Sequence, residues 1–184
     1  MIRERHLIEY CAPTLASLKT GNLFWIEYYS EEKLESSLTS LGELLTDKGV
    51  SVEVLRQKND RVLVYVYRHK RLCQDLNKPG VAEFLQTCGY EEITVEYALE
   101  RLKRRIARQG GFPHEIGLFL SYPLGDVIGF IENRGQNCKC VGCWKVYCDE
   151  CEAQKTFARF DKCCQVYKRL FQQGLSLWQL TVAA

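Results

Sequence analysis

Apolar residues recur along this chain with two different periods, and these periods predict a mixture of helices and strands. Steps of three and four residues are typical of one buried helix face. They place one helix after Ser30 and a long helix after Asp149, and both residues are good N-caps. The first apolar stripe comprises Leu34, Leu38, Leu41 and Leu45, and the second comprises Ala153, Phe157, Phe160, Cys164, Tyr167 and Phe171.

Aromatic and β-branched runs predict the strands. The turn sequence Lys58-Asn59-Asp60 should join strands at 50–55 and 61–67 into an antiparallel hairpin, and the second strand is apolar on both faces, which favours a central position. Further strands are expected at 23–29, 116–120 and 144–147. Further helices are expected at the N-terminus, from Pro13, and at 70–76, 79–87, 94–109 and 124–133. The prediction is an α/β (α+β) fold: one domain over residues 1–184, with a mixed central sheet of about five strands flanked by helices and a long C-terminal helix.

Composition narrows the classes of protein. The 184 residues are 46% hydrophobic and 26% charged, which is ordinary for a globular domain, and the formal net charge of +2 makes nucleic acid an unlikely partner. No apolar run approaches the roughly 20 residues that span a bilayer, and residues 1–10 contain acids rather than the apolar core of a signal peptide. We therefore expect a cytoplasmic protein without a membrane partner, whose ten cysteines are thiols or metal ligands rather than disulfides.

Half of these cysteines form a C-x-C-x-x-C-x(4)-C-x-x-C run within a cysteine-rich subregion at 137–164. The run comprises Cys138, Cys140, Cys143, Cys148 and Cys151. Such density suggests a zinc or iron/iron–sulfur site, or a thiol-redox centre. A straight strand from Cys143 to Cys148 would separate them by roughly 16 Å at about 3.3 Å per residue. Either that segment bends, or the fourth ligand comes from elsewhere; the candidates are Cys163, Cys164 and His114.

The alternative is that several of these cysteines are small buried hydrophobic residues and the others are exposed thiols. This alternative suits Cys73, Cys88 and Cys164 better than Cys138, Cys140 and Cys143. Cys164 lies on the apolar stripe of the long helix and is expected in the core, which leaves Cys163 freer.

Cys11 and His114 suggest a second function. A cysteine hydrolase or acyltransferase needs a thiolate near a helix N-terminus and a histidine that accepts its proton. Cys11 precedes the helix expected at Pro13, and His114 precedes the strand expected at 116–120. The alternative is that Cys11 packs in the core and His114 caps a loop.

Basic residues suggest a third function. Arg101, Arg104, Arg105 and Arg108 share one face of the helix expected at 94–109. Together they could bind a phosphate, an acidic partner or RNA, although a charged helix face is more often simply solvated.

Several long segments resemble a known family. They are FPHEIGLFLSYPL at 112–124, DVIGFIEN at 126–133 and WKVY at 144–147, with CAPTLA at 11–16 and KTGNLF at 19–24. They are similar to uncharacterised proteins of Firmicutes, mostly clostridia, that share domain of unknown function 3793. The resemblance implies a cytosolic bacterial protein and supplies no activity. Cys148 and Cys151 depart from the family pattern, which has glycine and an acidic residue there.

These observations favour a metal-binding or thiol-redox accessory protein centred on the cysteine run, with another redox or metal-handling protein as its partner. The hydrolase using Cys11 and His114, and the binding module using the arginine stripe, stay as alternatives.

Overall fold

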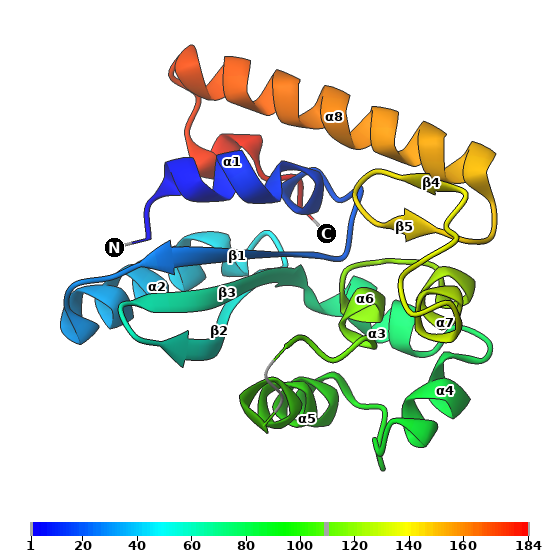
Figure 1. Cartoon of the computed structure of the whole chain (residues 1–184). Coiled ribbons are helices and arrows are strands. Elements are labelled where there is room, and N and C mark those ends of the chain that lie inside the picture. The colour runs from blue at the N-terminus through cyan, green and yellow to red at the C-terminus, as the bar shows by residue number, and fades with distance from the viewer. Residues whose placement is uncertain (1, 109–110, 184) are drawn as a thin grey trace.

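The computed structural model describes residues 2–108 and 111–183, and at its centre lies an antiparallel sheet of three strands (Figure 1). The strands are β1 (Gly21–Glu27), β2 (Val50–Lys58) and β3 (Arg61–Arg68), in the order β1-β3-β2. The hairpin of β2 and β3 and the central place of β3 are as predicted. Asn59 has a φ of 53° in the turn between them, a conformation that asparagine tolerates well.

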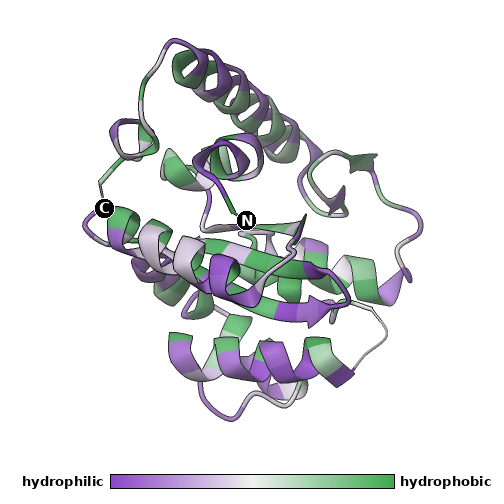
Figure 2. Ribbon diagram, turned by 90° about the vertical axis from the view of Figure 1, so that its left-hand side faces the viewer, coloured by the Kyte–Doolittle hydropathy of each residue, from purple (hydrophilic) through white to green (hydrophobic). Residues whose placement is uncertain are grey.

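Each face of the sheet carries its own core, because successive side chains of β3 point to opposite sides. Val62, Val64 and Val66 share a core with four helices: α1 (Glu4–Leu15), α2 (Glu31–Thr46), α8 (Glu150–Gln172) and α9 (Leu177–Leu180). Of these, α8 lies over α1, on the side away from the sheet (Figure 1). Leu63, Tyr65 and Tyr67 face a second layer. That layer comprises α3 (His69–Leu76), α4 (Val81–Thr87), α5 (Val95–Arg108), α6 (Ile116–Phe119) and α7 (Leu124–Glu132). Apolar and polar residues accordingly share the surfaces of these helices (Figure 2).

Helices α2 and α8 begin at the predicted caps. The Ser30 side chain accepts a hydrogen bond from the backbone N–H of Lys33 at 3.4 Å, and the Asp149 carboxylate accepts one from that of Glu152 at 3.0 Å. None of the helices in the described residues is both long enough and apolar enough to cross a membrane.

Arg68, at the end of β3, joins distant parts of the chain. Its side chain is buried and donates to the carbonyl oxygens of Thr14 at 2.6 Å, Leu15 at 2.7 Å, Val182 at 2.7 Å and Lys48 at 3.1 Å. Two of these carbonyls end α1, where the helix dipole favours a cation. The Arg68 guanidinium thus supplies hydrogen bonds to carbonyl groups at the C-terminal end of α1, where the helix itself has no further N–H groups to donate.

Three predictions about elements were wrong. The sheet has three antiparallel strands, and two short strands form a separate hairpin, β4 (Cys140–Val141) and β5 (Lys145–Val146), so there is no mixed sheet of five in the described residues. The apolar run at 116–120 is the short helix α6, wound by bonds such as Leu118 N–H to Glu115 O at 3.0 Å. Pro13 does not start a helix, because α1 continues through it.

The predicted roles of two neighbouring cysteines on α8 were reversed. Cys163 is 8% exposed and belongs to the core beneath α1, whereas Cys164 is half-buried at its edge.

Candidate functional site

A cavity of about 440 Å³ lies between the segment ahead of α6, helix α7 and the β4–β5 hairpin, and four aromatic side chains contribute to its wall. These elements lie together beside α3 in Figure 1. The aromatic lining residues are Phe112, Tyr122, Phe130 and Trp144, and the polar ones are His114, Asp126 and Lys145. Cavities of this size and character are the usual places for small ligands.

Trp144 is held in the wall by contacts on several sides. Its indole lies 5.0 Å from the Tyr122 ring in a stacked arrangement and 4.5 Å from the Phe157 ring in an edge-on arrangement, measured between centroids. Its Nε1–H donates to Asp126 at 2.8 Å. The Tyr122 hydroxyl donates to the carbonyl oxygen of Cys143 at 3.0 Å, which ties the segment after α6 to the hairpin turn.

Asp126, in the first turn of α7, anchors the hairpin. One of its carboxylate oxygens accepts the indole hydrogen of Trp144, and the other accepts the backbone N–H groups of Tyr147 and Cys148, each at 2.8 Å. Gly129, one turn further along α7, allows this close packing, since a side chain there would meet the Cβ of Tyr147 at 2.6 Å. With both oxygens occupied, Asp126 serves the architecture of the cavity rather than acting as a free acid.

The two remaining polar groups lie at the open side of the cavity. His114 is exposed, and its ring centroid lies 5.2 Å from that of Phe130. Lys145 donates from Nζ to the carbonyl oxygen of Gly135 at 2.6 Å, and Nζ lies 5.9 Å from the centre of the Phe130 ring. An ammonium has three donors, so Lys145 retains capacity for a ligand. The cavity therefore presents aromatic walls and a cation.

Lys19 occupies an unusual place behind this wall. The residue is 5% exposed, and its Nζ lies 5.6 Å from the centre of the Tyr122 ring and 6.0 Å from that of Phe160. No carboxylate pairs with it among the residues described. Burial lowers the pKa of Lys19, while the thiols of Cys143, Cys11 and Cys164 act in the opposite direction. Lys19 thus lies among thiols and aromatic rings.

The cysteine run is spread along the hairpin and into α8. Cys140 lies in β4 opposite Val146, Cys143 occupies the turn, and Cys148 lies beyond the other strand. Cys138 is half-buried next to β4, and Cys151 is exposed in the first turn of α8.

The predicted metal centre at these five cysteines is therefore unsupported. In the part of the chain that the structure describes, no three histidine, cysteine or acidic side chains come together as a metal site would need. All ten cysteines are free. Burial raises the pKa of Cys140, Cys143 and Cys148, which disfavours thiolates at neutral pH.

Cys11 and His114 occupy different environments. Cys11 is fully buried in the core beneath α1, in the middle of the helix rather than at its start, and burial raises its pKa far above the ordinary range. His114 lies at the exposed side of the cavity, and no hydrogen bond joins the two within the described residues. The structure does not bring this predicted pair together.

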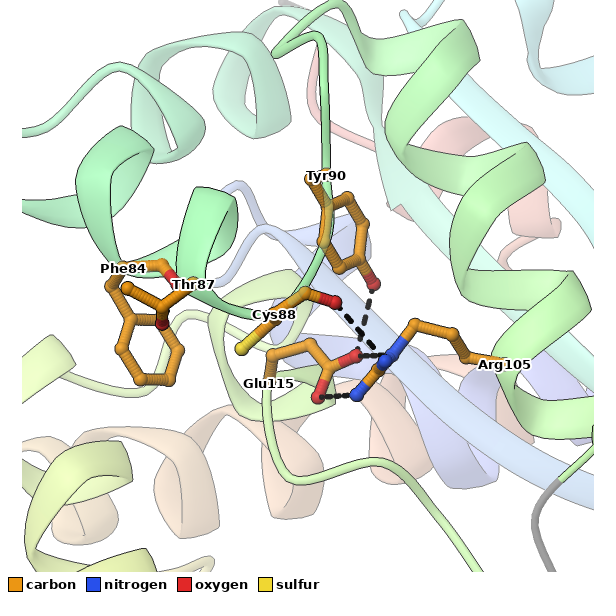
Figure 3. Close-up of polar contacts among 6 residues, drawn as sticks. All are labelled: Phe84, Thr87, Cys88, Tyr90, Arg105 and Glu115. Atoms are coloured by element: carbon orange, nitrogen blue, oxygen red, sulfur yellow. Dashed lines mark hydrogen bonds and ion pairs between the residues drawn. The ribbon is translucent and has the colours of Figure 1, made fainter.

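The arginine stripe of α5 is largely engaged within the protein. Arg105 forms an ion pair with the buried Glu115 and donates to the carbonyl oxygen of Cys88 at 3.0 Å (Figure 3). Arg104 pairs with Glu100 at 3.0 Å. Arg101 packs against Gly89, where an added Cβ would lie 2.8 Å from its Nη2, and Arg108 is exposed. The four guanidinium groups do not converge on one site.

Sequence reasoning did not select Lys19, Tyr122, Asp126 and Trp144 as site residues. A signal was present, because each lies inside one of the segments that carry the family resemblance, and the fold brings those segments together. The isolated charge of Asp126, next to Val127 and Ile128, is a further signal of a buried polar contact.

Comparison with known proteins agrees with that resemblance. The model of a family described as "Protein of unknown function (DUF3793)" matches residues 7–181. No curated protein and no solved structure matches the chain. Since the matched region covers nearly the whole sequence, the chain belongs to the DUF3793 family of proteins of unknown function.

Proposed function

We propose that this protein binds a small aromatic anion in the cavity beneath Trp144. The observation that carries the proposal is the composition of the wall: four aromatic rings line a cavity of about 440 Å³, and Lys145 and His114 are the polar groups with donors to spare. Flat rings favour a flat ligand, because stacked and edge-on contacts add to simple burial.

The charged side chains of the cavity favour an anionic ligand. The Asp126 carboxylate already accepts three hydrogen bonds, so it offers little to a cation. Lys145 is positive and close to the aromatic wall. A carboxylate on the ligand could accept from Lys145 and from His114, and such charge-assisted bonds are the stronger class.

Isothermal titration with indole-3-acetate and with neutral indole tests the proposal. Saturable binding of the acid is expected, with weaker binding of indole. Lys145→Gln should weaken binding of the acid by about tenfold, since a hydrogen bond to a charged group contributes about 1.5–3 kcal/mol. Lys162→Gln, an equivalent change at an exposed site on α8, should have no effect.

A second variant shows whether binding occurs in the cavity. Ile116 lines the cavity and is half-buried, so Ile116→Trp should fill the space and abolish binding without removing a core side chain. Equal affinity for indole and its acid, or full binding by Ile116→Trp, would contradict the proposal.

A thiol function at Cys143 is a second candidate, and the buried Lys19 favours it. The ammonium of Lys19 lowers the pKa of Cys143, opposing the larger effect of burial. A thiolate at Cys143 would give Lys19 the counter-charge that no carboxylate provides among the described residues. Site-resolved alkylation with iodoacetamide tests this pairing: Lys19→Met should slow modification of Cys143 severalfold and leave the exposed Cys73 unchanged. Equal slowing at both cysteines would argue against it.

The metal proposal for Cys138, Cys140, Cys143, Cys148 and Cys151 has its own test. Zinc and iron would be measured by elemental analysis after anaerobic purification. Stoichiometric metal that disappears in Cys143→Ser would support the site, and its absence from the anaerobic protein would end the proposal.

A further inference from the structure

A second depression, of about 720 Å³, lies where the start of α1, the end of β1 and the first turn of α2 meet. These segments lie at the left of Figure 1. The lining residues are mainly cationic or aromatic. The cations are Arg3, Arg5, Lys33 and Arg61, and the aromatic residues are Tyr10, Trp25, Tyr29 and the imidazole His6. This place is separate from the cavity beneath Trp144 and shares no lining residue with it.

The residues that line this depression carry more positive than negative charge. None of its four cations forms an ion pair with a described residue, although ion pairs occur elsewhere on the surface. Glu27 is the carboxylate in the lining, so four cations face one acid. A concave surface of one sign concentrates anions, and arginine in particular matches the oxygens of a phosphate.

Aromatic surface lies beside this charge. The Tyr29 side chain is 88% exposed, and the guanidinium carbon of Arg61 lies 5.6 Å from the centre of the Trp25 ring. An exposed large ring has no role in the core, and rings next to cations are the usual platform for a nucleobase.

His6 adds a donor that responds to charge. Its Nδ1 accepts the backbone N–H of Arg3 at 3.0 Å, so the neutral ring carries its proton on Nε2. Burial and the neighbouring Arg5 lower the pKa of His6, with a further contribution from Arg3 and an opposing one from Glu9. A bound phosphate would offset these cations and raise that pKa.

We infer that this depression binds a nucleotide, with its phosphates on Arg3, Arg5 and Lys33 and its base on Tyr29 or Trp25. The volume suits one nucleotide, and a net charge of +2 for the whole chain does not suit a long polyanion.

Isothermal titration of the full chain with ADP, adenosine and inorganic pyrophosphate tests the inference. ADP should bind more tightly than either part alone. Arg5→Gln and Lys33→Gln should each weaken ADP binding by about tenfold, the effect of losing one charge-assisted bond. Tyr29→Ala should weaken ADP but not pyrophosphate, since stacking of a base contributes about 1–3 kcal/mol. Lys70→Gln, at an exposed position on α3, is the matched control and should bind normally.

Proton NMR of the histidines supplies an independent measurement, because ADP should raise the pKa of His6. The inference is overturned if ADP does not saturate, if Arg5→Gln and Lys70→Gln weaken it equally, or if pyrophosphate alone binds as tightly. Much tighter binding of an adenine oligonucleotide, with steep salt dependence, would also overturn it by assigning the surface to single-stranded nucleic acid.

Discussion

Arg105 on α5 and Glu115 ahead of α6 form a bidentate ion pair in which the carboxylate of Glu115 is buried. Arg105 donates from Nε and from Nη2 to the two carboxylate oxygens, the second at 3.3 Å, and the Glu115 side chain is 2% exposed. The Tyr90 hydroxyl donates to the same carboxylate at 3.2 Å (Figure 3). One arginine of the predicted stripe thus pairs with a buried carboxylate of the same protein.

We expect Arg105→Met to destabilise the protein by about 3 kcal/mol, because it leaves a buried carboxylate without its cation. Arg104→Met is the matched control, since its partner Glu100 is exposed and such pairs contribute at most about 1 kcal/mol. Urea denaturation of both variants measures the difference. Equal losses would show that burial of Glu115 carries no such cost.

Asp126→Ala should loosen the β4–β5 hairpin. The substitution leaves the indole N–H of Trp144 and the backbone N–H groups of Tyr147 and Cys148 without their acceptor, at a cost of about 1–3 kcal/mol for each group that stays buried. Urea denaturation and near-ultraviolet circular dichroism measure the result. Glu132→Ala, at an exposed position on the same helix, should leave both unchanged, and a loss as large as that of Asp126→Ala would show that the hydrogen bonds of Asp126 contribute nothing particular to stability.

Lys19 predicts a particular pH dependence of stability. Burial lowers its pKa below the ordinary 10.5, so between the two values the unfolded chain holds a proton that the folded protein lacks. Stability therefore rises with pH in that window, and Lys19→Met removes this contribution.

The measurement is the free energy of unfolding at about pH 8 and about pH 10.5, in the unmodified protein and in Lys19→Met. For every pH unit between the folded and the unfolded pKa of Lys19, the free energy of unfolding should rise by about 1.4 kcal/mol. As pH rises, the free energy of unfolding of the unmodified protein should increase relative to that of Lys19→Met. Lys162→Met should show no such movement, and a flat difference for Lys19 would mean that its pKa is ordinary.

Arg68→Met should cost about 3 kcal/mol or more, because four carbonyl groups lose a charged donor at once. Arg159→Met, at an exposed position on α8, should change stability by less than about 0.5 kcal/mol. Thermal denaturation of the two variants measures this contrast, and similar melting temperatures would contradict it.

Local patterns predicted what local interactions determine. The stripe of Leu34, Leu41 and Leu45 defined α2, and the apolar β3 was placed centrally because both of its faces had to be covered. The strand prediction at 116–120 was wrong because a short buried helix and a short buried strand have the same apolar composition. The prediction at Pro13 was wrong because proline is most common in the first turn of a helix, whereas α1 contains Pro13 in its last turn and lacks the hydrogen bond that an N–H there would make.

Contacts between distant segments could not be read from spacing. The backbone N–H of Thr20 donates to Ser121 Oγ at 2.7 Å across 101 residues, and the local sequence around either residue does not predict this contact. Likewise, the density of the cysteine run suggested that its thiols converge, whereas pairing of Cys140 with Val146 draws the run out along a hairpin. The candidate site emerged from such long-range contacts, so the sequence indicated its segments but not their arrangement.

The packing of α1 against the C-terminal helices affects how the protein folds during translation. Its core face, with Leu7, Cys11 and Leu15, is covered by α8 and α9, and the Leu15 carbonyl accepts the backbone N–H of Val182 at 3.0 Å. A ribosome therefore releases the helix that needs this cover long before the cover itself exists. The β2–β3 hairpin and α2 can form during that interval, but the side of α1 that α8 and α9 cover stays exposed until those two helices have been synthesised.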